Sequence, residues 1–143
     1  MGGCSALMYP CYSRAAHRPV AAAANCPVCD LPFHATERPD LPRTMYSSFA
    51  HYDCGVDMAM RLHSPLHRAM AGELPRLPYL IVHGESDSQV NKTAHSDKLV
   101  HVMRERGYDV EYIAVPGMEH CDMGKFPEAE HRYWEFIKSF AEN

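Results

Sequence analysis

The segment LPYLIVHGESDSQV (Leu77–Val90) is the clearest indication of the fold class in this sequence. Its first half is apolar and follows a proline, which is typical of a strand buried on both faces of a parallel sheet, so we predict a strand over residues 78–83. Its second half is polar and leads into a segment with apolar residues at helical spacing, which predicts a helix over Asn91–Arg106. Gly107 is expected to end that helix, since glycine readily takes the left-handed conformation of a C-cap.

Two further segments have the composition of strands. DVEYIAVPG predicts a strand over residues 109–115, and PVAAAANCPV predicts one over residues 20–26. Between Ala129 and Ala141 apolar residues again recur at helical spacing, which predicts a last, amphipathic helix. Apolar strands that alternate with helices form a parallel sheet covered on both faces. We therefore expect an α/β protein with three parallel strands and flanking helices.

The remaining segments are shorter or less regular. Residues Gly2–Tyr9 suit a short helix that Pro10 helps to end. Residues 31–72 contain several prolines and no sustained strand pattern, so we expect an irregular, cap-like excursion with short helices over Leu41–Ala50 and Val56–Leu62. Such an excursion would cover part of the sheet.

Composition excludes several classes of partner. The 143 residues carry a formal net charge of -4 and no run of Lys and Arg, which argues against nucleic-acid binding and against an anionic membrane surface. No apolar stretch reaches the roughly 18 residues that span a bilayer. In the absence of a recognisable signal sequence we interpret the six cysteines as free thiols of a cytoplasmic protein.

The cysteines and histidines offer no clear metal site. Cys26 and Cys29 have the spacing of a redox or zinc dithiol, but a four-ligand zinc site needs a second close pair, and Cys54 and Cys121 are isolated in the sequence. Pro27 fits a strand end that turns into a loop equally well. We expect no metal and no cofactor. The histidines that form no metal pattern are interpreted as surface and loop residues: His51, His63, His67, His95, His101 and His131.

Two ionisable residues follow predicted strands by a few positions. Asp87 comes after the strand over residues 78–83, and His120 comes after the strand over residues 109–115. The carboxyl ends of neighbouring parallel strands meet at one edge of the sheet, so the two side chains are expected to touch. A carboxylate that orients an imidazole is two thirds of a nucleophile-His-Asp triad. The alternative is that Asp87 only caps the following helix and that His120 is an ordinary loop residue.

From Ser64 to Cys121 the chain resembles the end of a prolyl-oligopeptidase-type α/β-hydrolase domain. That family carries Ser-Pro before the penultimate strand, as at Ser64-Pro65, and then P-x-L-[IL]-x-H-G-x-x-D-x-x-V, which here is Pro78–Val90. A G-x-x-H segment follows the last strand, here Gly117–His120. The resemblance implies that residues 1–143 are the C-terminal part of a single α/β-hydrolase domain.

The same resemblance assigns functional roles. It makes Asp87 the triad acid and His120 the general base of an enzyme that hydrolyses a peptide or an ester. The nucleophile elbow of the family reads G-x-S-x-G-G, and the opening MGGCSA is similar to its second half. Met1 would then follow the nucleophile and offer a backbone oxyanion donor, while Gly2 and Gly3 would let the following helix pack closely on the sheet. The nucleophilic serine would precede Met1, so we expect the 143 residues alone to be inactive.

Two alternatives stay open. Gly2-Gly3-Cys4-Ser5-Ala6 matches G-x-C-x-[GA] and resembles the cysteine elbow of dienelactone hydrolases, although Cys4 would lie about one helical turn beyond the expected nucleophile. The chain is otherwise a non-catalytic remnant or an interaction scaffold. In either case the first predicted strand would expose an apolar edge, so self-association through that edge is expected.

Overall fold

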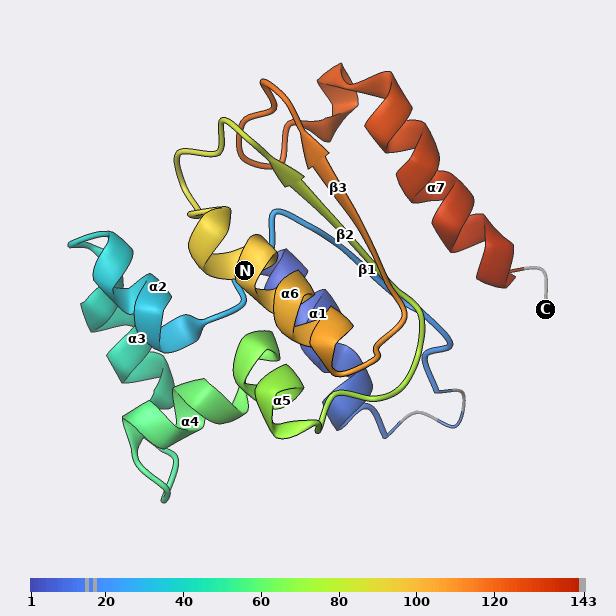
Figure 1. Ribbon diagram of the computed structural model, residues 1–143. Coiled ribbons are helices and arrows are strands. Elements are labelled where there is room, and N and C mark those ends of the chain that lie inside the picture. The colour runs from blue at the N-terminus through green and yellow to red at the C-terminus, as the bar shows by residue number, and fades with distance from the viewer. Residues whose placement is uncertain (15, 17, 142–143) are drawn as a thin grey trace.

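Three parallel strands form the sheet of this protein, for which a computed structural model describes residues 1–14, 16 and 18–141 (Figure 1). The elements are, in chain order, α1 (Gly2–Tyr12), β1 (Ala22–Asn25), α2 (Leu31–Glu37), α3 (Leu41–Phe49), α4 (Val56–Leu62), α5 (Pro65–Ala71), β2 (Tyr79–Gly84), a π-helical turn (Thr93–Asp97), α6 (Lys98–Glu105), β3 (Val110–Val115), a 3-10 turn (Met123–Lys125) and α7 (Pro127–Ala141). None of the helices in the described part of the chain is long and apolar enough to cross a membrane.

The strand order is β1-β2-β3, and both pairings are parallel. Tyr79 at the start of β2 is in register with Ala22 of β1 and with Val110 of β3. All six residues of the central strand are buried, as its unbroken apolar run predicts. The three predicted strands are therefore confirmed, although β1 is shorter than the expected residues 20–26.

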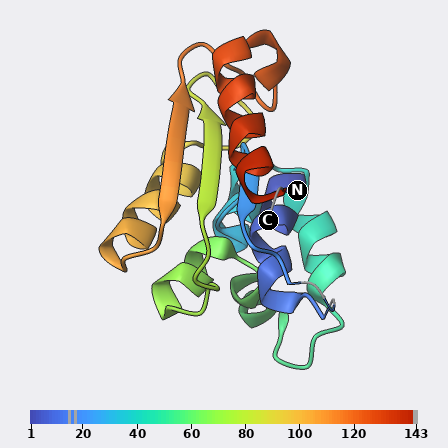
Figure 2. The same cartoon turned by 90° about the vertical axis from the view of Figure 1, so that its right-hand side faces the viewer.

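Helices cover both faces of the sheet (Figures 1 and 2). Side chains that alternate along β2 point to opposite sides, so Tyr79 and Ile81 pack with residues of α1, α5 and α6, whereas Leu80 and Val82 pack with Phe136 of α7. Each face thus has its own apolar core. This arrangement is the three-stranded parallel sheet with flanking helices that the sequence predicted.

The helix expected over Asn91–Arg106 is present but begins with a π-helical turn. The Asn91 side-chain oxygen accepts a hydrogen bond from the Ala94 N–H at 2.9 Å, which satisfies one of the free N–H groups at the start of the helix. At the other end Gly107 has φ +69°, and the N–H of Tyr108 donates to the Met103 carbonyl at 2.9 Å. Gly107 therefore ends the helix as predicted.

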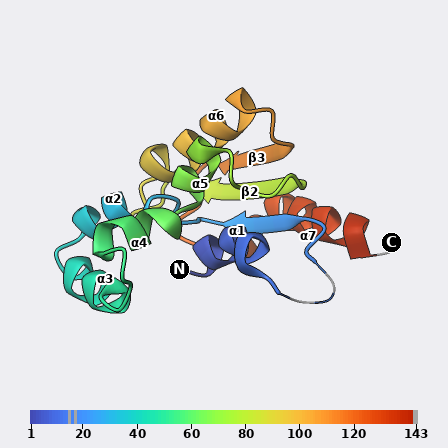
Figure 3. The same ribbon diagram turned by 90° about the horizontal axis from the view of Figure 1, so that it is seen from below.

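The segment expected to be irregular contains four short helices, α2 to α5. Two of them, α3 and α4, confirm the helices predicted over Leu41–Ala50 and Val56–Leu62. Pro39 lies between helices, but three other prolines stand in the first turn of a helix: Pro32, Pro42 and Pro65 open α2, α3 and α5. A proline is tolerated there, since the first N–H groups of a helix have no intrahelical partner. Figure 3 shows α2, α3 and α4 grouped beyond the end of the sheet to which the strands point.

Pro10 does not end the first helix, which continues to Tyr12. A proline this close to the C-terminus of a helix removes only one hydrogen bond, and the N–H of Ser13 still donates to the Tyr9 carbonyl at 2.9 Å. The helix buries Cys4, Leu7 and Met8 against the sheet and the short helices. After the proline, the partly buried Cys11 packs against the same cores.

The two glycines at the start of α1 differ in what surrounds them. A Cβ added at Gly3 would lie 2.9 Å from the Asn25 carbonyl oxygen and 2.9 Å from the Pro27 Cα, whereas a Cβ at Gly2 meets no described atom within 4 Å. Close packing of α1 on the end of β1 thus requires glycine at position 3 and not at position 2.

We expect Gly3→Ala to lower the free energy of unfolding by about 1–3 kcal/mol, because backbone atoms of β1 and the following loop must move. Gly2→Ala is the matched control and should be neutral or slightly stabilising, since alanine favours a helix over glycine. Urea unfolding followed by circular dichroism measures both variants. Equal stability of the two variants would contradict the packing assigned to Gly3.

Candidate active site

Asp87 and His120 lie together at the carboxyl ends of β2 and β3. The Nδ1 atom of His120 is 2.8 Å from Oδ2 of Asp87. The Asp87 side chain is completely buried, while that of His120 is 32% exposed. The register of two adjacent parallel strands brings the two loops together. The structure therefore has the contact between these side chains that the sequence predicted.

The second carboxylate oxygen of Asp87 has another task. Oδ1 accepts hydrogen bonds from the N–H groups of Gln89 and Val90, at 2.8 and 2.9 Å. These bonds close the loop between β2 and the following helix and fix the plane of the carboxylate. Oδ2 is thus the partner of His120, while Oδ1 closes the loop. The cap that the alternative interpretation expected from Asp87 is supplied by Asn91, because the helix begins only at Thr93.

A third side chain contacts Asp87, and the sequence reasoning gave it no role. His83 is fully buried in β2, with Nε2 3.2 Å from Asp87 Oδ2 and 3.2 Å from the Val90 carbonyl oxygen. Its Nδ1 is 2.6 Å from the Ser96 hydroxyl oxygen. The carbonyl can only accept, so Nε2 carries a proton and the Ser96 hydroxyl donates to Nδ1. Burial lowers the pKa of His83, which favours this neutral form. The feature of the sequence that could have indicated a role for His83 is the presence of a histidine within an otherwise apolar strand.

The protonation of the pair follows from these contacts. Burial raises the pKa of Asp87, but the hydrogen bonds from the Val90 N–H, His120 and the Gln89 N–H outweigh it, so the pKa of Asp87 is lowered. Asp87 is thus a carboxylate near neutral pH and accepts the proton on His120 Nδ1. In neutral His120 the lone pair is then on Nε2, the nitrogen that a general base uses.

Gly84 allows the loop of His120 to approach the end of β2. A Cβ at this position would lie 2.0 Å from the Met118 carbonyl oxygen and 2.7 Å from its carbonyl carbon. That carbonyl accepts a hydrogen bond from the Ser86 N–H at 3.1 Å, which joins the two loops. Only glycine fits at this contact.

Two cysteines lie beside the free nitrogen of His120. The Sγ of Cys121 is 3.5 Å from Nε2, and the Cys26 thiol, at the end of β1, accepts a hydrogen bond from the Cys121 N–H at 3.4 Å. Cys29 is fully buried instead, with its thiol directed to the Pro27 carbonyl oxygen at 3.4 Å. The structure thus places Cys121, which is isolated in the sequence, next to Cys26.

Met1 and Cys4 stand at the start of α1. The Met1 ammonium lies close enough to Cys121 to counteract in part the burial that raises the pKa of that thiol. Cys4 is buried, its thiol donates to the His63 carbonyl oxygen at 3.7 Å, and burial raises its pKa to about 11. A buried thiol that stays protonated is a poor nucleophile. The role of Cys4 in the structure is packing in an apolar core.

A second polar cluster lies under the short helices. Nε2 of His95 and Nδ1 of His34 are 2.8 and 2.6 Å from the same oxygen, Oε2 of Glu37. His95 was expected at the surface, but it is fully buried, and its Nδ1 accepts the N–H groups of Cys29 and Asp30 at 3.1 and 3.2 Å. Its burial is possible because every polar atom of the ring is paired. The cluster therefore fastens α2 to the π-helical turn.

We expect Glu37→Gln to lower the free energy of unfolding by about 1–3 kcal/mol, because an amide has one acceptor oxygen where the carboxylate uses two. Oε2 accepts from both histidines, and Oε1 accepts from the Asn91 N–H at 3.1 Å. Glu105→Gln is the control, since Glu105 pairs with His101 at the exposed surface. Urea unfolding at pH 7 compares the two. Similar losses would show that the buried cluster contributes no more than a surface pair.

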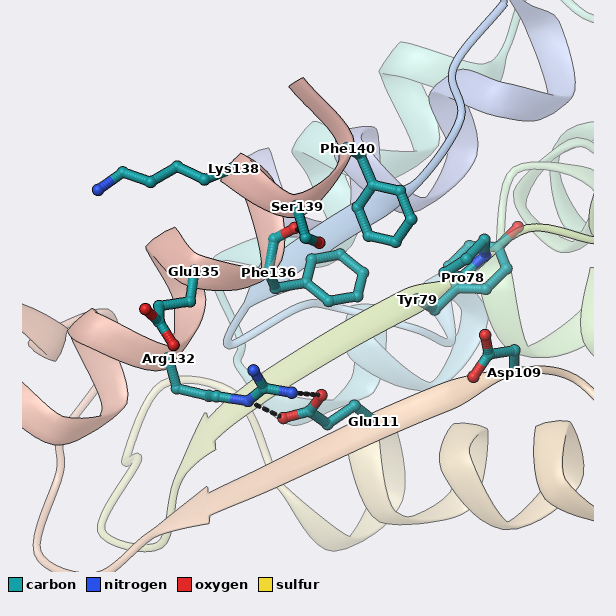
Figure 4. Close-up of a pocket in the computed structure, with 10 residues that line it drawn as sticks. All are labelled: Pro78, Tyr79, Asp109, Glu111, Arg132, Glu135, Phe136, Lys138, Ser139 and Phe140. Atoms are coloured by element: carbon teal, nitrogen blue, oxygen red, sulfur yellow. Dashed lines mark hydrogen bonds and ion pairs between the residues drawn. The ribbon is translucent and has the colours of Figure 1, made fainter. Parts of the chain in front are cut away.

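A hollow of about 520 Å³ lies at the opposite end of the sheet, between α7 and the starts of β2 and β3 (Figure 4). Arg132 spans it with hydrogen bonds of 2.7 and 2.6 Å to the two carboxylate oxygens of Glu111. Ligands of parallel sheets bind at the carboxyl ends of the strands, so this hollow is not the expected site. A smaller hollow of about 360 Å³ borders Asp87 itself and is lined by Phe33, Glu37 and Arg38 of the helical segment.

Comparison with known proteins supports the fold and no finer relationship. Neither family models nor curated proteins gave a match to the sequence. Among solved structures, the chain is similar to an acylaminoacyl peptidase of Pyrococcus horikoshii (17% identity, 98% of this chain and 22% of that chain, TM-score 0.65). It is also similar to a puromycin-hydrolysing peptidase of Mycobacterium tuberculosis (19% identity, 92% of this chain and 20% of that chain, TM-score 0.70). A third similar structure is esterase B of Lactobacillus rhamnosis (16% identity, 99% of this chain and 49% of that chain, TM-score 0.72). The chain spans about a fifth to a half of these proteins.

Proposed function

We propose that this chain supplies the acid and the general base of a serine hydrolase of prolyl-oligopeptidase type, and that the nucleophile belongs to a residue that precedes Met1 in a longer polypeptide. The observation that carries the proposal is the pairing of His120 Nδ1 with the buried carboxylate of Asp87 at 2.8 Å, which leaves Nε2 as the acceptor. This is the arrangement that acyl transfer from a triad requires.

Each partner then has a defined step. His120 Nε2 accepts the proton of the serine hydroxyl as its oxygen attacks the acyl carbon, and Asp87 stabilises the imidazolium that forms. The imidazolium gives the same proton to the leaving amine or alcohol, and an acyl-serine remains. Water then repeats the sequence, with His120 again accepting and returning a proton, and releases the acid.

The start of α1 supports the position of the nucleophile. Met1 is the N-cap residue of α1, and the charge on its backbone nitrogen partly offsets the burial that raises the pKa of the Cys121 thiol, which is itself 3.5 Å from His120 Nε2. As an amide, that nitrogen would be an oxyanion donor, and loss of one such donor typically costs about 10²–10³-fold in kcat.

The coding DNA upstream of Met1 is the first test. An in-frame Gly-x-Ser directly before Met1 supports the proposal, and the extended protein should then react with a fluorophosphonate probe at that serine. The 143-residue protein, prepared in parallel, should not react. A stop codon or an unrelated sequence upstream would favour the non-catalytic scaffold and contradict the proposal.

A second experiment distinguishes the cysteine-elbow alternative, with Cys4 as the nucleophile, from the proposed serine hydrolase. The 143-residue protein is assayed with an activated ester, together with Cys4→Ala and with Cys54→Ala, which removes an exposed thiol. We expect no turnover in any of the three. Turnover that disappears only in Cys4→Ala would make Cys4 the nucleophile.

Peptide and ester substrates are distinguished by assay of the extended protein with a panel of both. The neighbouring structures include peptidases and an esterase, and Asp87 and His120 would serve either reaction in the same way. The edge of β1 also belongs to the proposal, because among the strands of the described residues β1 pairs only with β2. Light scattering of the 143-residue protein should detect self-association through that edge.

A further inference from the structure

The thiols of Cys26 and Cys121 and the free nitrogen of His120 converge on one point. Their ligand atoms all lie within 4.8 Å of one another, although the three residues come from the loops that follow β1 and β3. Cys26 and Cys121 are also the non-glycine residues with positive φ in the described part of the chain, at +45° and +56°. A left-handed backbone is unfavourable for cysteine, so both loops are bent at the residues whose thiols converge.

The distances match those between ligands of a tetrahedral zinc ion. With Zn–S of about 2.3 Å and Zn–N of about 2.0–2.1 Å, a tetrahedral ion separates a sulfur from a nitrogen ligand by about 3.5 Å and two sulfurs by about 3.8 Å. The separation of Cys121 Sγ from His120 Nε2 is 3.5 Å. The remaining separations, which involve the Cys26 thiol, are at most 4.8 Å and must shorten by up to about 1.3 Å to reach the values around an ion.

The surroundings also suit a cation. The Nδ1 of His120 is bound to the buried carboxylate of Asp87, which is the outer-shell partner that metal-binding histidines usually have. The buried Asp87 carboxylate beside the cluster carries a negative charge, which attracts a cation. Two thiolates and one imidazole balance the charge of a divalent ion and prefer zinc to magnesium or calcium.

We propose that Cys26, His120 and Cys121 bind a zinc ion with three protein ligands and one open position. The cluster of His34, Glu37 and His95 has metal-ligating residues at similar separations but does not qualify. His95 Nδ1 accepts two backbone N–H groups, so its Nε2 carries the proton and has no lone pair for a metal. His120 has the opposite tautomer and leaves Nε2 open.

The zinc site has a consequence for the proposed hydrolase, and this step rests on the proposed function. Zinc on His120 Nε2 occupies the lone pair that must accept the serine proton, so a bound ion would inhibit acyl transfer. The metal site itself stands on the geometry of the three residues. Its test therefore uses binding and not activity, so that failure of either proposal is recognised separately.

The test is titration of the reduced 143-residue protein with Co²⁺ and then with Zn²⁺. We expect one equivalent of Co²⁺ to produce a thiolate-to-cobalt charge-transfer absorption, and one equivalent of Zn²⁺ to remove it. Asp87→Asn removes the outer-shell partner and should weaken the metal affinity by roughly 10–100-fold. A larger loss of affinity is expected for each variant that removes a ligand: Cys121→Ser, Cys26→Ser and His120→Ala.

Cys54→Ser is the matched control, because its exposed thiol is outside the cluster and lies 3.8 Å from the neighbouring Gly55 carbonyl oxygen. This variant should bind both metals as the wild type does. Cys121 is itself exposed, so Cys121→Ser is expected to fold, and circular dichroism verifies this. The proposal is overturned if the wild type gives no charge-transfer absorption, or if folded Cys121→Ser binds Co²⁺ with unchanged affinity.

Discussion

Replacing Asp87 with asparagine is expected to lower kcat by about 10⁴-fold in a polypeptide that carries the nucleophile. The carboxylate accepts the proton on His120 Nδ1 at 2.8 Å, whereas an asparagine side chain can present its NH₂ group there instead. The histidine would then keep its proton on Nε2 and lose the lone pair that accepts the serine proton. The loss should appear in kcat, because the imidazolium that Asp87 stabilises forms only during the reaction.

The measurement is steady-state kinetics of the extended protein with an activated ester. Asp122→Asn is the matched control, since Asp122 follows His120 in the same loop but pairs with Lys125 at 2.7 Å at the surface. It should change kcat little. A loss below tenfold for Asp87→Asn would mean that Asp87 only closes the loop through its bonds to Gln89 and Val90.

Gly84→Ala is expected to lower kcat of the same extended protein by about 10²-fold or more, because a misplacement of about 1 Å has that effect on a catalytic group. The new Cβ would lie 2.0 Å from the Met118 carbonyl oxygen, which is backbone and cannot rotate away. The loop of His120 must therefore move away from the end of β2, and the contact with Asp87 lengthens.

Gly124→Ala is the control for this variant. Gly124 also follows His120, in the 3-10 turn, and a Cβ there meets no described atom within 4 Å. Nuclear magnetic resonance of the imidazole nitrogens in the 143-residue protein provides a readout that does not depend on the nucleophile. Unchanged resonances of His120 in a folded Gly84→Ala protein would contradict the close approach of the two loops.

Local patterns were sufficient to predict the sheet. β2 and β3 were predicted from apolar runs, and α6 and α7 from apolar residues at helical spacing, because side-chain period along one segment reports which faces are buried. The short helices α2 and α5 were missed. Each begins with a proline in its first turn, and a proline there favours a helix start, although the same residue in isolation indicates a break.

The contact between Asp87 and His120 was predictable from the amino-acid sequence, because each residue follows one of two apolar strands joined by a single helix, and such strands lie side by side in a parallel sheet. The groups beside Nε2 of His120 could not be predicted in this way, because they depend on the tertiary fold. Cys26 and Cys121 are 95 residues apart, and the strand order β1-β2-β3 together with two left-handed residues brings them together. The burial of His95 also depends on the tertiary fold. Glu37 of α2 accepts a hydrogen bond from Nε2 of His95, and the N–H groups of Cys29 and Asp30, which follow β1, donate to its Nδ1. Hydrophobic period describes one segment at a time, whereas hydrogen-bond and thiol partners depend on how loops from several segments converge.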